Sequence, residues 1–507
     1  MALSIFPPLA LAVNNRNENI GLADVLPALG ICLWLASVAW VASKFATLDP
    51  HRRGLITLAV VGWFLGYGLL AGWLKAAEPV SALAEDDFLL PGTALLLLLA
   101  CWKILRYRKD LAGASRFLNL MSLFLLLFLP ITYLSTSPDP RPSWKPTLPE
   151  PGTVAAPSAR PDIYYIVLDA YTGRSSLAQT YGFDNDTFET GLRARGFYIP
   201  KHSRANYAAT FLALAAALNW EYLDWIPRVL GAGSRDRSIL YDMIENNRTM
   251  RFLKRLGYRI VFLPTSYRGT SRSPQADELI PSDAAGQPAI QGEFLPVWLG
   301  TTALRPLLQL GCRFRSCDQV PFRHEPPSLI LWKFARLAEL PTVSRSPKFV
   351  LAHMLVPHEP YVFKSDCSPK SFSWEAATDP DTDSARVAYV EQVQCVNRQV
   401  LQLVDHLIQD SPRPPVIILQ ADHGNARFPF GRPPSLEDIS AEQLMERTDV
   451  FAAYYTSKAS TEFYDSITPI NVIPAVLRAY FGASIPRQED RTYYSSWHEP
   501  YRFTRVR

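Results

Sequence analysis

The sequence has little cysteine and almost no excess of charge, and both absences exclude classes of protein. Six cysteines in 507 residues are too few for a small scaffold held together by disulfides. The 51 basic and 47 acidic residues nearly balance, which argues against a nucleic-acid-binding protein and against a disordered polyanion. Hydrophobic residues make up 48% of the chain and charged residues only 19%, so the chain can build a core or enter a membrane.

Four apolar stretches without a charged residue lie near the N-terminus. About 20 apolar residues cross a bilayer, and a soluble helix of this length would show a polar face that these stretches lack. The predicted spans are Val25–Ser43, Leu55–Leu74, Phe88–Trp102 and Phe117–Ser135. Leu3–Val13 is also apolar but short, and it contains two prolines, so it is either a fifth, truncated span or a segment at the membrane interface.

The charges of the loops predict how these spans are oriented. The loops between the first and second spans and between the third and fourth are basic, with Lys44, Arg52, Arg53, Lys103, Arg106, Arg108, Lys109 and Arg116. The loop between the second and third spans is acidic, with Glu78, Glu85, Asp86 and Asp87. Basic loops stay in the cytoplasm, so everything after Ser135 is predicted to lie outside the cytoplasmic (inner) membrane, in the periplasm or an equivalent space.

Residues 136–160 hold seven prolines and predict a semi-rigid linker, because such a chain favours an extended polyproline conformation. The sequence is thus divided into a transmembrane domain (1–135), this linker, and an outer domain (161–507). In the outer domain, helical patterns such as 187–195, 241–256 and 384–408 alternate with short apolar runs rich in β-formers. These runs are Ile163–Leu168, Arg259–Leu263, Lys348–Ala352, Val416–Gln420 and Val450–Tyr454. The alternation predicts an α/β fold with a largely parallel sheet buried on both faces.

Four cysteines fall in the outer domain: Cys312, Cys317, Cys367 and Cys395. An even number outside the cytoplasm predicts two disulfides, for which three pairings are possible. Cys312–Cys317 with Cys367–Cys395 closes the shortest loops and is the preferred pairing. A zinc site is the alternative, although no histidine stands at finger-like spacing.

Acidic and imidazole side chains follow three of the predicted strands. Asp169 comes directly after the first, Asp422 and His423 follow the run from Val416, and His353 follows the run from Phe349, with His358 five residues later. A single Asp after a strand is usually a turn or capping residue. Several at the carboxyl ends of neighbouring strands instead predict a site for one divalent metal, and carboxylate oxygen with imidazole nitrogen suits Zn²⁺ or Mn²⁺.

Thr210 precedes the apolar run Phe211–Leu218, which is rich in good helix formers. It therefore stands at a predicted helix N-terminus, where an anion is favoured. Thr210 could simply cap this helix. Alternatively, a metal bound to its hydroxyl oxygen would lower the hydroxyl pKa and make Thr210 a nucleophile.

Together these residues resemble the membrane-bound, sulfatase-like branch of the alkaline phosphatase superfamily, to which lipoteichoic acid synthases and lipid A phosphoethanolamine transferases belong. The most specific run is Pro414–Gly424, and the segments 468–473, 480–482 and 490–495 extend the resemblance over the whole outer domain. The resemblance implies an alkaline-phosphatase-like three-layer domain. It also implies a metal-activated threonine that attacks a phosphoester, forms a phosphothreonine intermediate and passes the group on.

The resemblance also implies a role for each residue. The metal would be held by Asp169, Thr210, Asp422 and His423. Thr210 and His358 would be catalytic, His353 and His358 would bind the substrate phosphate or protonate the leaving group, and Asn206 would donate a hydrogen bond to a phosphate oxygen.

Three departures from the family pattern bear on function. The transferases typically have Glu where Asp169 stands, and no further histidine follows His423 at short distance, which puts a second metal in doubt. Thr210 does not stand in a C/S-x-P-x-R motif, which disfavours cleavage of sulfate esters.

The sequence thus predicts a membrane-anchored, metal-dependent phosphotransferase that moves a phospho-head group between lipid or envelope glycan substrates, with a membrane lipid as donor or acceptor. Two alternatives remain: a hydrolase of phosphate or sulfate esters with the same site, and a non-catalytic envelope protein on the same fold. Transferase and hydrolase are not separated by these residues, because water and an alcohol attack the same intermediate. The head group, the acceptor and the oligomeric state are not predicted.

Overall fold

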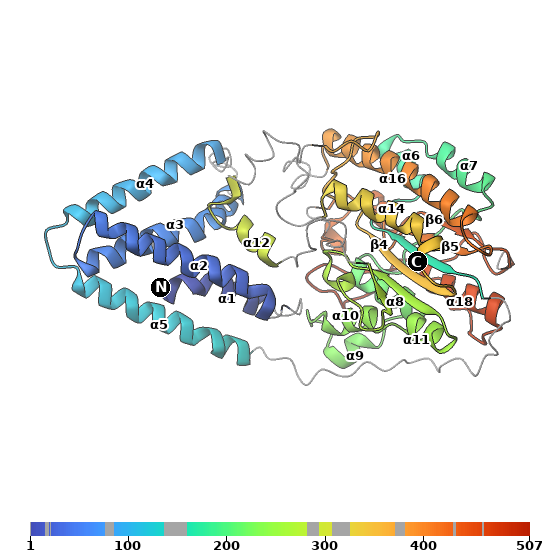
Figure 1. Ribbon diagram of the computed structural model, residues 1–507, viewed down its shortest axis with the longest axis horizontal. Coiled ribbons are helices and arrows are strands. Elements are labelled where there is room, and N and C mark those ends of the chain that lie inside the picture. Colours follow the sequence, from blue (N-terminus) through green and yellow to red (C-terminus); the bar gives the residue numbers. More distant parts are fainter. Residues whose placement is uncertain are drawn as a thin grey trace. The chain divides into compact units, whose positions relative to one another are not determined.

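The computed structural model describes residues 2–15, 20, 22–76, 86–135, 160–280, 294–306, 325–370, 381–428, 432–458 and 461–507. The chain forms two compact units (Figure 1). The first comprises Met1–Pro140 with Gln291–Arg315 and Pro321–Arg323, and the second comprises the rest. Nearly all of the predicted linker lies outside the described residues.

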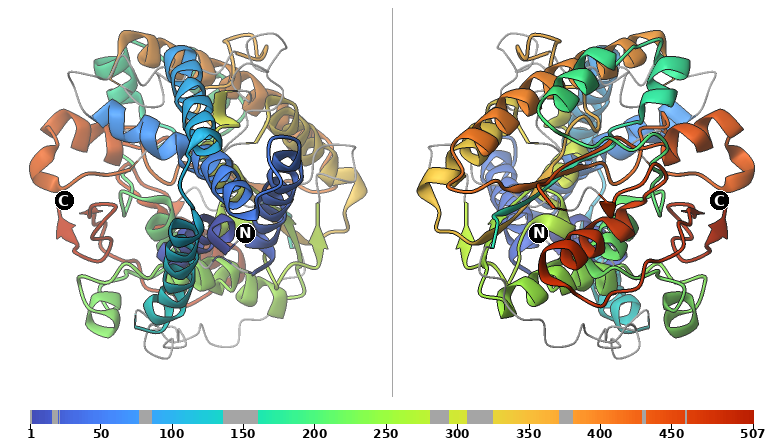
Figure 2. Two further views of the ribbon diagram at one scale, coloured as in Figure 1. Left: turned by 90° about the vertical axis from the view of Figure 1, so that its left-hand side faces the viewer. Right: turned by 90° about the vertical axis from the view of Figure 1, so that its right-hand side faces the viewer.

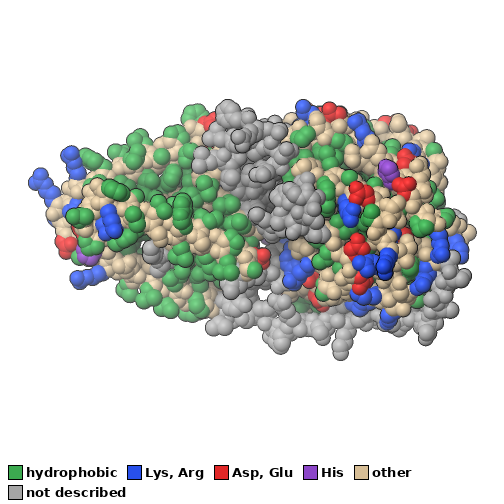
Figure 3. Space-filling view, viewed as in Figure 1, with side chains coloured by type: hydrophobic (Ala, Val, Ile, Leu, Met, Phe, Trp, Pro, Cys, Tyr) green, Lys and Arg blue, Asp and Glu red, His purple; other side chains and the backbone are tan. Residues whose placement is uncertain are grey.

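The first unit is built from apolar helices. They are α1 (Ala2–Asn14), α2 (Leu22–Ala42), η2 (Ser43–Phe45), α3 (Pro50–Ala76), α4 (Asp86–Arg106), α5 (Ala112–Ser135) and α12 (Phe294–Gly300). Four segments, on α2 with η2, α3, α4 and α5, are long and apolar enough to cross a membrane, which confirms the four predicted spans. The predicted short segment at residues 3–13 is helical but shorter than these four. Hydrophobic side chains cover much of this unit in Figure 3, as expected for helices that face lipid.

Helix α12 comes from far along the sequence but packs in the first unit. Trp298 on α12 is buried in one cluster with Cys32 of α2. The N–H of Gly68 on α3 donates to the carbonyl of Thr301 at 3.0 Å. A Cβ at Gly68 would lie 2.6 Å from the carbonyl oxygen of Gly300, so only glycine permits this approach. The division predicted from the sequence placed this segment in the outer domain, and no proline or charge pattern marks its return.

The second unit holds a six-stranded sheet in the order β3-β2-β4-β1-β5-β6. The strands are β1 (Ile163–Leu168), β2 (Arg259–Leu263), β3 (Glu278–Leu279), β4 (Lys348–Met354), β5 (Val416–Gln420) and β6 (Ala452–Tyr455). Neighbouring strands are parallel except β6, which runs antiparallel to β5. A second, two-stranded sheet pairs β7 (Tyr493–Tyr494) with β8 (Thr504–Arg505). The predicted largely parallel α/β sheet is confirmed.

Helices cover both faces of the six-stranded sheet, as Figure 1 and Figure 2 show. Successive residues of β1 belong to different clusters: Ile163 and Tyr165 pack on one face, and Tyr164 and Ile166 on the other. Helices on the first face are α8 (Thr210–Asn219), α10 (Ser238–Glu245), α11 (Arg248–Arg255) and α18 (Pro469–Phe481). On the second face are α6 (Arg174–Tyr181), α7 (Asp186–Ala194), α14 (Pro327–Val343) and α16 (Asp383–Gln409). The result is three layers, helices, sheet and helices.

The second unit also contains the shorter elements α9 (Ile226–Leu230), η4 (Arg268–Thr270), η7 (Leu436–Asp438) and α17 (Ala441–Thr448). One predicted helix, residues 241–256, is in fact two helices, α10 and α11. The break lies at Asn247, which caps α11 by accepting a hydrogen bond from the N–H of Met250. The asparagine side chain hydrogen-bonds to nearby backbone groups and therefore favours helix caps over helix interiors. The apolar periodicity continues on both sides of Asn247, so the sequence pattern did not indicate this break.

A disulfide links Cys367 to Cys395 on α16, with their Cα atoms 4.9 Å apart. This is one of the two bonds in the preferred pairing. Cys312 and Cys317 lie outside the described residues, so their predicted bond stays a prediction.

Candidate active site

The site lies at the carboxyl ends of the three central strands of the second unit. Strand β1 lies between β4 and β5, and the register pairs Val167 with both His353 and Gln420. Asp169 follows β1 directly, and Asp422 comes two residues after β5, so both carboxylates emerge at the same edge.

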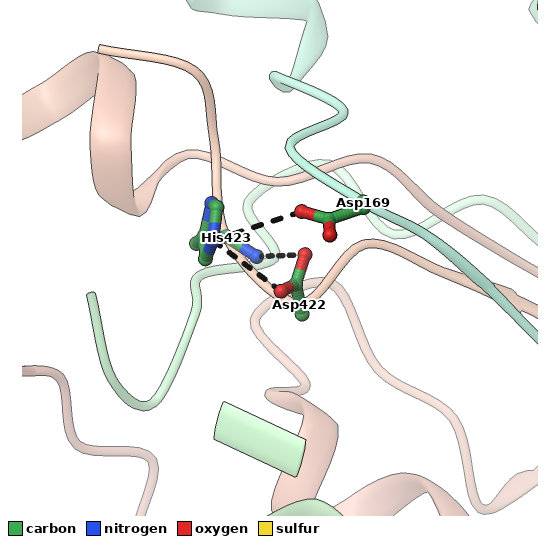
Figure 4. Close-up of side chains that lie close together, drawn as sticks. All are labelled: Asp169, Asp422 and His423. Atoms are coloured by element: carbon green, nitrogen blue, oxygen red, sulfur yellow. Dashed lines mark hydrogen bonds and ion pairs between the residues drawn. The ribbon is translucent and has the colours of Figure 1, made fainter. Parts of the chain in front are cut away.

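Asp169, Asp422 and His423 form a buried cluster in which one ligand atom of each lies within 4.8 Å of the others (Figure 4). Asp169 Oδ1 and Asp422 Oδ2 make no hydrogen bond with the residues that the structure describes. Each carboxylate thus keeps one buried oxygen without a hydrogen bond among these residues, which is costly because burial disfavours charge and the two charges repel. A divalent cation would remove both penalties, and two carboxylate oxygens with an imidazole nitrogen suit Zn²⁺ or Mn²⁺.

The orientation of His423 fits a metal ligand. Its Nδ1 lies 3.0 Å from the carbonyl oxygen of Gly424. A carbonyl only accepts, so Nδ1 carries the proton and Nε2 keeps its lone pair. Nε2 lies 3.3 Å from Asp422 Oδ2 and 3.8 Å from Asp169 Oδ1. The lone pair is therefore directed into the cluster.

Thr210 adds a hydroxyl to this cluster. Its Oγ1 lies 2.9 Å from His423 Nε2. Thr210 is the first residue of α8, and the capping position belongs to Ala209, which has extended backbone angles. Thr210 is therefore not the cap of the helix. Its hydroxyl faces the cluster at a helix N-terminus, where the helix dipole favours negative charge.

Burial and neighbouring charges shift the pKa values of the two carboxyls in opposite directions. Burial alone would raise the pKa of Asp169, but the nearby His358, His353 and His423 more than reverse this and lower it. Burial, together with the charge of Asp169, raises the pKa of Asp422 to about 6. Strong opposite shifts on adjacent carboxyls are typical of functional sites.

The two histidines of the predicted His353-x4-His358 pair occupy different places. His353 lies within β4, not after it, and is buried. Its Nε2 lies 3.2 Å from Asp169 Oδ2. His358 is partly exposed, and its ring centroid lies 6.2 Å from that of His423.

The protonation of His358 suits an acid. Its Nδ1 lies 2.7 Å from the carbonyl oxygen of Glu359, which requires a proton on Nδ1. Burial opposes the charged form, but the charges of Asp169 and Glu359 outweigh it and raise the pKa of His358. Thr210 and His358 are both partly exposed, whereas Asp169, Asp422 and His423 are buried, so a substrate would meet these two side chains first.

Arg447, at the end of α17, completes the site and was missed in the sequence. Its Nε donates to the carbonyl of Ala208 at 2.7 Å, and its Nη1 donates to the carbonyls of Gly424 and Asn425 at 3.1 and 3.0 Å. Its Nη2 lies 3.2 Å from His423 Nε2. This buried guanidinium joins the loop before Thr210 to the loop that carries His423. A single arginine 24 positions after His423 gives no signal of this in the sequence.

Asn206 is buried beside the same loop, but its amide contacts protein groups. Its Nδ2 donates to the carbonyl of Arg491 at 3.0 Å and to the hydroxyl of Tyr222 at 3.2 Å. Its Oδ1 accepts from the N–H of Ile470 at 2.9 Å. The amide thereby ties the loop before Thr210 to the C-terminal part of the chain. Its predicted contact with a phosphate oxygen stays a prediction.

Neither a protein-family model nor a curated protein matches the sequence. Among solved structures, the C-terminal periplasmic domain of EptC from Escherichia coli, in complex with Zn, is 11% identical, with 69% of this chain and 94% of that chain covered and a TM-score of 0.45. Lipooligosaccharide phosphoethanolamine transferase A from Neisseria meningitidis, an integral membrane protein, is 14% identical over 95% of both chains, with a TM-score of 0.40. A 2-O GAG sulfatase is 15% identical over 68% of this chain and 74% of that chain, with a TM-score of 0.38.

With identities of this size, the assignment of a reaction depends on the geometry of the site.

Proposed function

We propose that this protein is a membrane-anchored, metal-dependent phosphotransferase with Thr210 as its nucleophile. The observation that carries the proposal is the position of the Thr210 hydroxyl, 2.9 Å from His423 Nε2 and next to two buried carboxylate oxygens without hydrogen bonds among the described residues.

One divalent cation, Zn²⁺ or Mn²⁺, would be held by Asp169, Asp422, His423 and the Thr210 oxygen. Such a cation lowers the pKa of a bound hydroxyl and stabilises negative charge on a phosphoryl oxygen. Asp169 and Asp422 offer the oxygens Oδ1 and Oδ2, and neutral His423 offers its Nε2 lone pair. Among the described residues, Asp169, Asp422 and His423 form a group of ligand atoms close enough to hold a cation, and no further histidine soon follows His423, so the proposal takes one cation.

The chain's own groups account for the two halves of the transfer. Thr210, having released its proton to water, attacks phosphorus through Oγ1, and the bond from phosphorus to the leaving alcohol breaks. His358, protonated because of its raised pKa, gives a proton to that leaving oxygen. In the second half neutral His358 takes the proton of the acceptor alcohol, the acceptor oxygen bonds to phosphorus, and Thr210 Oγ1 leaves.

The membrane helices support a lipid as donor or acceptor. Four helices of the first unit are long and apolar enough to cross a membrane, and the basic loops predict the catalytic unit on the periplasmic or extracellular side. An enzyme acting on a soluble ester would not need such an anchor. The experiment below is designed to identify the transferred head group and to test for a lipid acceptor.

The test is intact mass and metal analysis of the purified full chain after incubation with a phospholipid mixture. Wild type is expected to hold about one metal per chain and to carry a phospho-adduct on Thr210 whose mass names the transferred group. Thr210→Ala should lack the adduct, and Thr342→Ala, an exposed threonine on α14, should keep it. Metal with released product but no lipid-linked product would favour the hydrolase. Neither metal nor adduct would favour a non-catalytic protein.

A further inference from the structure

Two buried threonines, Thr265 and Thr270, lie behind His353 on the side away from Asp169. Both are at most 1% exposed, as is His353 itself. We infer that Thr270, oriented by Thr265, positions His353 so that its ring holds the Asp169 carboxylate and leaves the other oxygen of that carboxylate for the cation. The inference deepens the proposed function and rests on it.

The contacts form one continuous chain of polar atoms. The N–H of Tyr267 donates to Thr265 Oγ1 at 3.1 Å, and Thr265 Oγ1 lies 2.7 Å from Thr270 Oγ1. Thr270 Oγ1 lies 2.9 Å from His353 Nδ1. His353 Nε2 lies at an ion-pair distance of 3.2 Å from Asp169 Oδ2 and makes no hydrogen bond among the described residues. Because β4 is buried between β1 and β2, the ring has a fixed place between Thr270 and Asp169.

The carboxylate at one end sets the direction of the whole chain. A lone pair on His353 Nε2 facing a carboxylate oxygen at 3.2 Å would be repelled, whereas an N–H would be attracted, so Nε2 carries the proton. In the neutral ring Nδ1 then accepts, and Thr270 must donate to it. Thr270 in turn accepts from Thr265, whose own oxygen already accepts from the Tyr267 N–H.

The reverse direction of the chain would keep the 2.7 Å contact between the two hydroxyls and would add only a 3.4 Å contact from Thr265 to the carbonyl of Tyr267. The two hydroxyls can therefore serve either tautomer of His353. The Asp169 carboxylate, 3.2 Å from Nε2, favours the tautomer that carries its proton on Nε2.

This assigns His353 a positioning role and revises the phosphate-binding role that the sequence predicted for it. Both ring nitrogens face protein groups, and the ring is buried, whereas His358 is partly exposed. Oδ2 of Asp169 faces His353. Oδ1 of Asp169, which has no hydrogen bond within the described part of the chain, is therefore the oxygen left to meet Asp422 and His423. Outer hydrogen-bond partners of this kind orient metal ligands, and their loss typically lowers metal affinity about 10- to 100-fold.

The test measures Zn²⁺ affinity of the full chain in detergent by competition with a chromophoric chelator, which needs no activity. Thr270→Val keeps the side-chain volume and removes the hydroxyl, and affinity should fall about 10- to 100-fold. Thr270→Ser keeps the hydroxyl and should restore affinity to within about threefold of wild type. Thr265→Val, which leaves the Thr270 hydroxyl in place, should cause a smaller fall.

Thr249→Val is the matched control, because Thr249 is also buried and hydrogen-bonded, to Trp220 and to the carbonyl of Leu218. It should lower the midpoint of thermal unfolding without changing Zn²⁺ affinity. Wild-type affinity in Thr270→Val, or an equal loss in Thr270→Ser, overturns the inference while the proposed function stands. If Thr270→Val does not fold, the comparison of Thr270→Ser and Thr265→Val decides in the same way. A wild-type chain that binds neither Zn²⁺ nor Mn²⁺ overturns the proposed function, and the inference with it.

Discussion

The loop after β5 and the loop after β4 each bring a histidine to the same edge of the sheet. The pKa values of these two histidines are shifted in opposite directions. His423 and His358 both direct Nδ1 to a backbone carbonyl, at 3.0 and 2.7 Å, and their rings lie 6.2 Å apart. Burial and the charge of Arg447 lower the pKa of His423 well below its usual range. The charges of Asp169 and Glu359 overcome burial and raise the pKa of His358.

The comparison shows that the surroundings of each ring shift its pKa: burial and Arg447 lower the pKa of His423, and Asp169 and Glu359 raise that of His358. A metal ligand must be neutral, and the guanidinium of Arg447 beside Nε2 enforces that state. A general acid must hold a proton near neutral pH, and the carboxylate of Asp169 favours that state for His358. Each prediction below separates these two tasks.

The largest effect is expected from removing His423, the proposed metal-binding histidine. His423→Ala deletes one ligand and leaves the two carboxylates to repel each other, so Zn²⁺ should no longer bind and transfer should fall by about 10³-fold or more. Metal content and transfer are measured on the same preparation. His498→Ala, an exposed histidine, is the control and should behave as wild type. Retention of both metal and activity in His423→Ala would contradict the assignment of this ligand.

Removing the proposed acid should give a different result. His358→Gln is expected to bind Zn²⁺ like wild type while transfer falls about 10²- to 10⁴-fold, which is the usual contribution of a general acid. Because the raised pKa keeps His358 protonated at low pH, transfer that needs this proton should be lost as pH rises through that pKa. The pH profile of kcat should lose its alkaline limb in His358→Gln. An unchanged limb would assign it to another group.

Much of this arrangement could be predicted from the sequence, because it depends on local patterns. The apolar runs fixed β1, β4 and β5, and parallel strands end at one edge, so Asp169 and Asp422 were expected to meet. The length and lack of charge of the first helices predicted the four spans.

The rest depends on contacts between residues far apart in the chain, which no local pattern reports. Arg447 reaches back to Ala208, and Thr270 lies behind His353 only because β2 pairs with β4. The return of α12 to the first unit was missed for the same reason, since a seven-residue helix with little periodicity gives no signal of its partner.

Shortening the arginine tests what keeps His423 neutral. Arg447→Lys keeps the charge but cannot bond at once to the carbonyls of Ala208, Gly424 and Asn425, which the planar guanidinium reaches together. Zn²⁺ affinity should fall about 10- to 100-fold, as for other outer partners of ligands, and thermal stability should fall as well. Arg398→Lys, on the partly exposed side of α16, serves as the control. Wild-type affinity in Arg447→Lys would show that charge alone is sufficient.

The smallest effect is a gradual change of Zn²⁺ affinity with pH, which should depend on Asp422 and not on His358. Asp422 must lose its proton to bind a cation, so Zn²⁺ affinity should be constant above the pKa of about 6 and fall by up to about tenfold per pH unit below it. In the metal-free chain the sign of the effect on stability is reversed. Burial and Asp169 raise the pKa of Asp422 above its unfolded value, so its contribution is fully present at low pH and is lost as pH rises through about 6.

Thermal unfolding with and without Zn²⁺, at about pH 5 and about pH 8, separates the two cases. The difference between the Zn²⁺-loaded and metal-free midpoints should widen at the higher pH, and Asp422→Asn should abolish this widening because its amide does not titrate. His358→Gln should keep it, since His358 is not a ligand. If His358→Gln abolishes the widening and Asp422→Asn keeps it, then His358 and not Asp422 controls metal binding. That result would contradict the different roles proposed for His358 and His423.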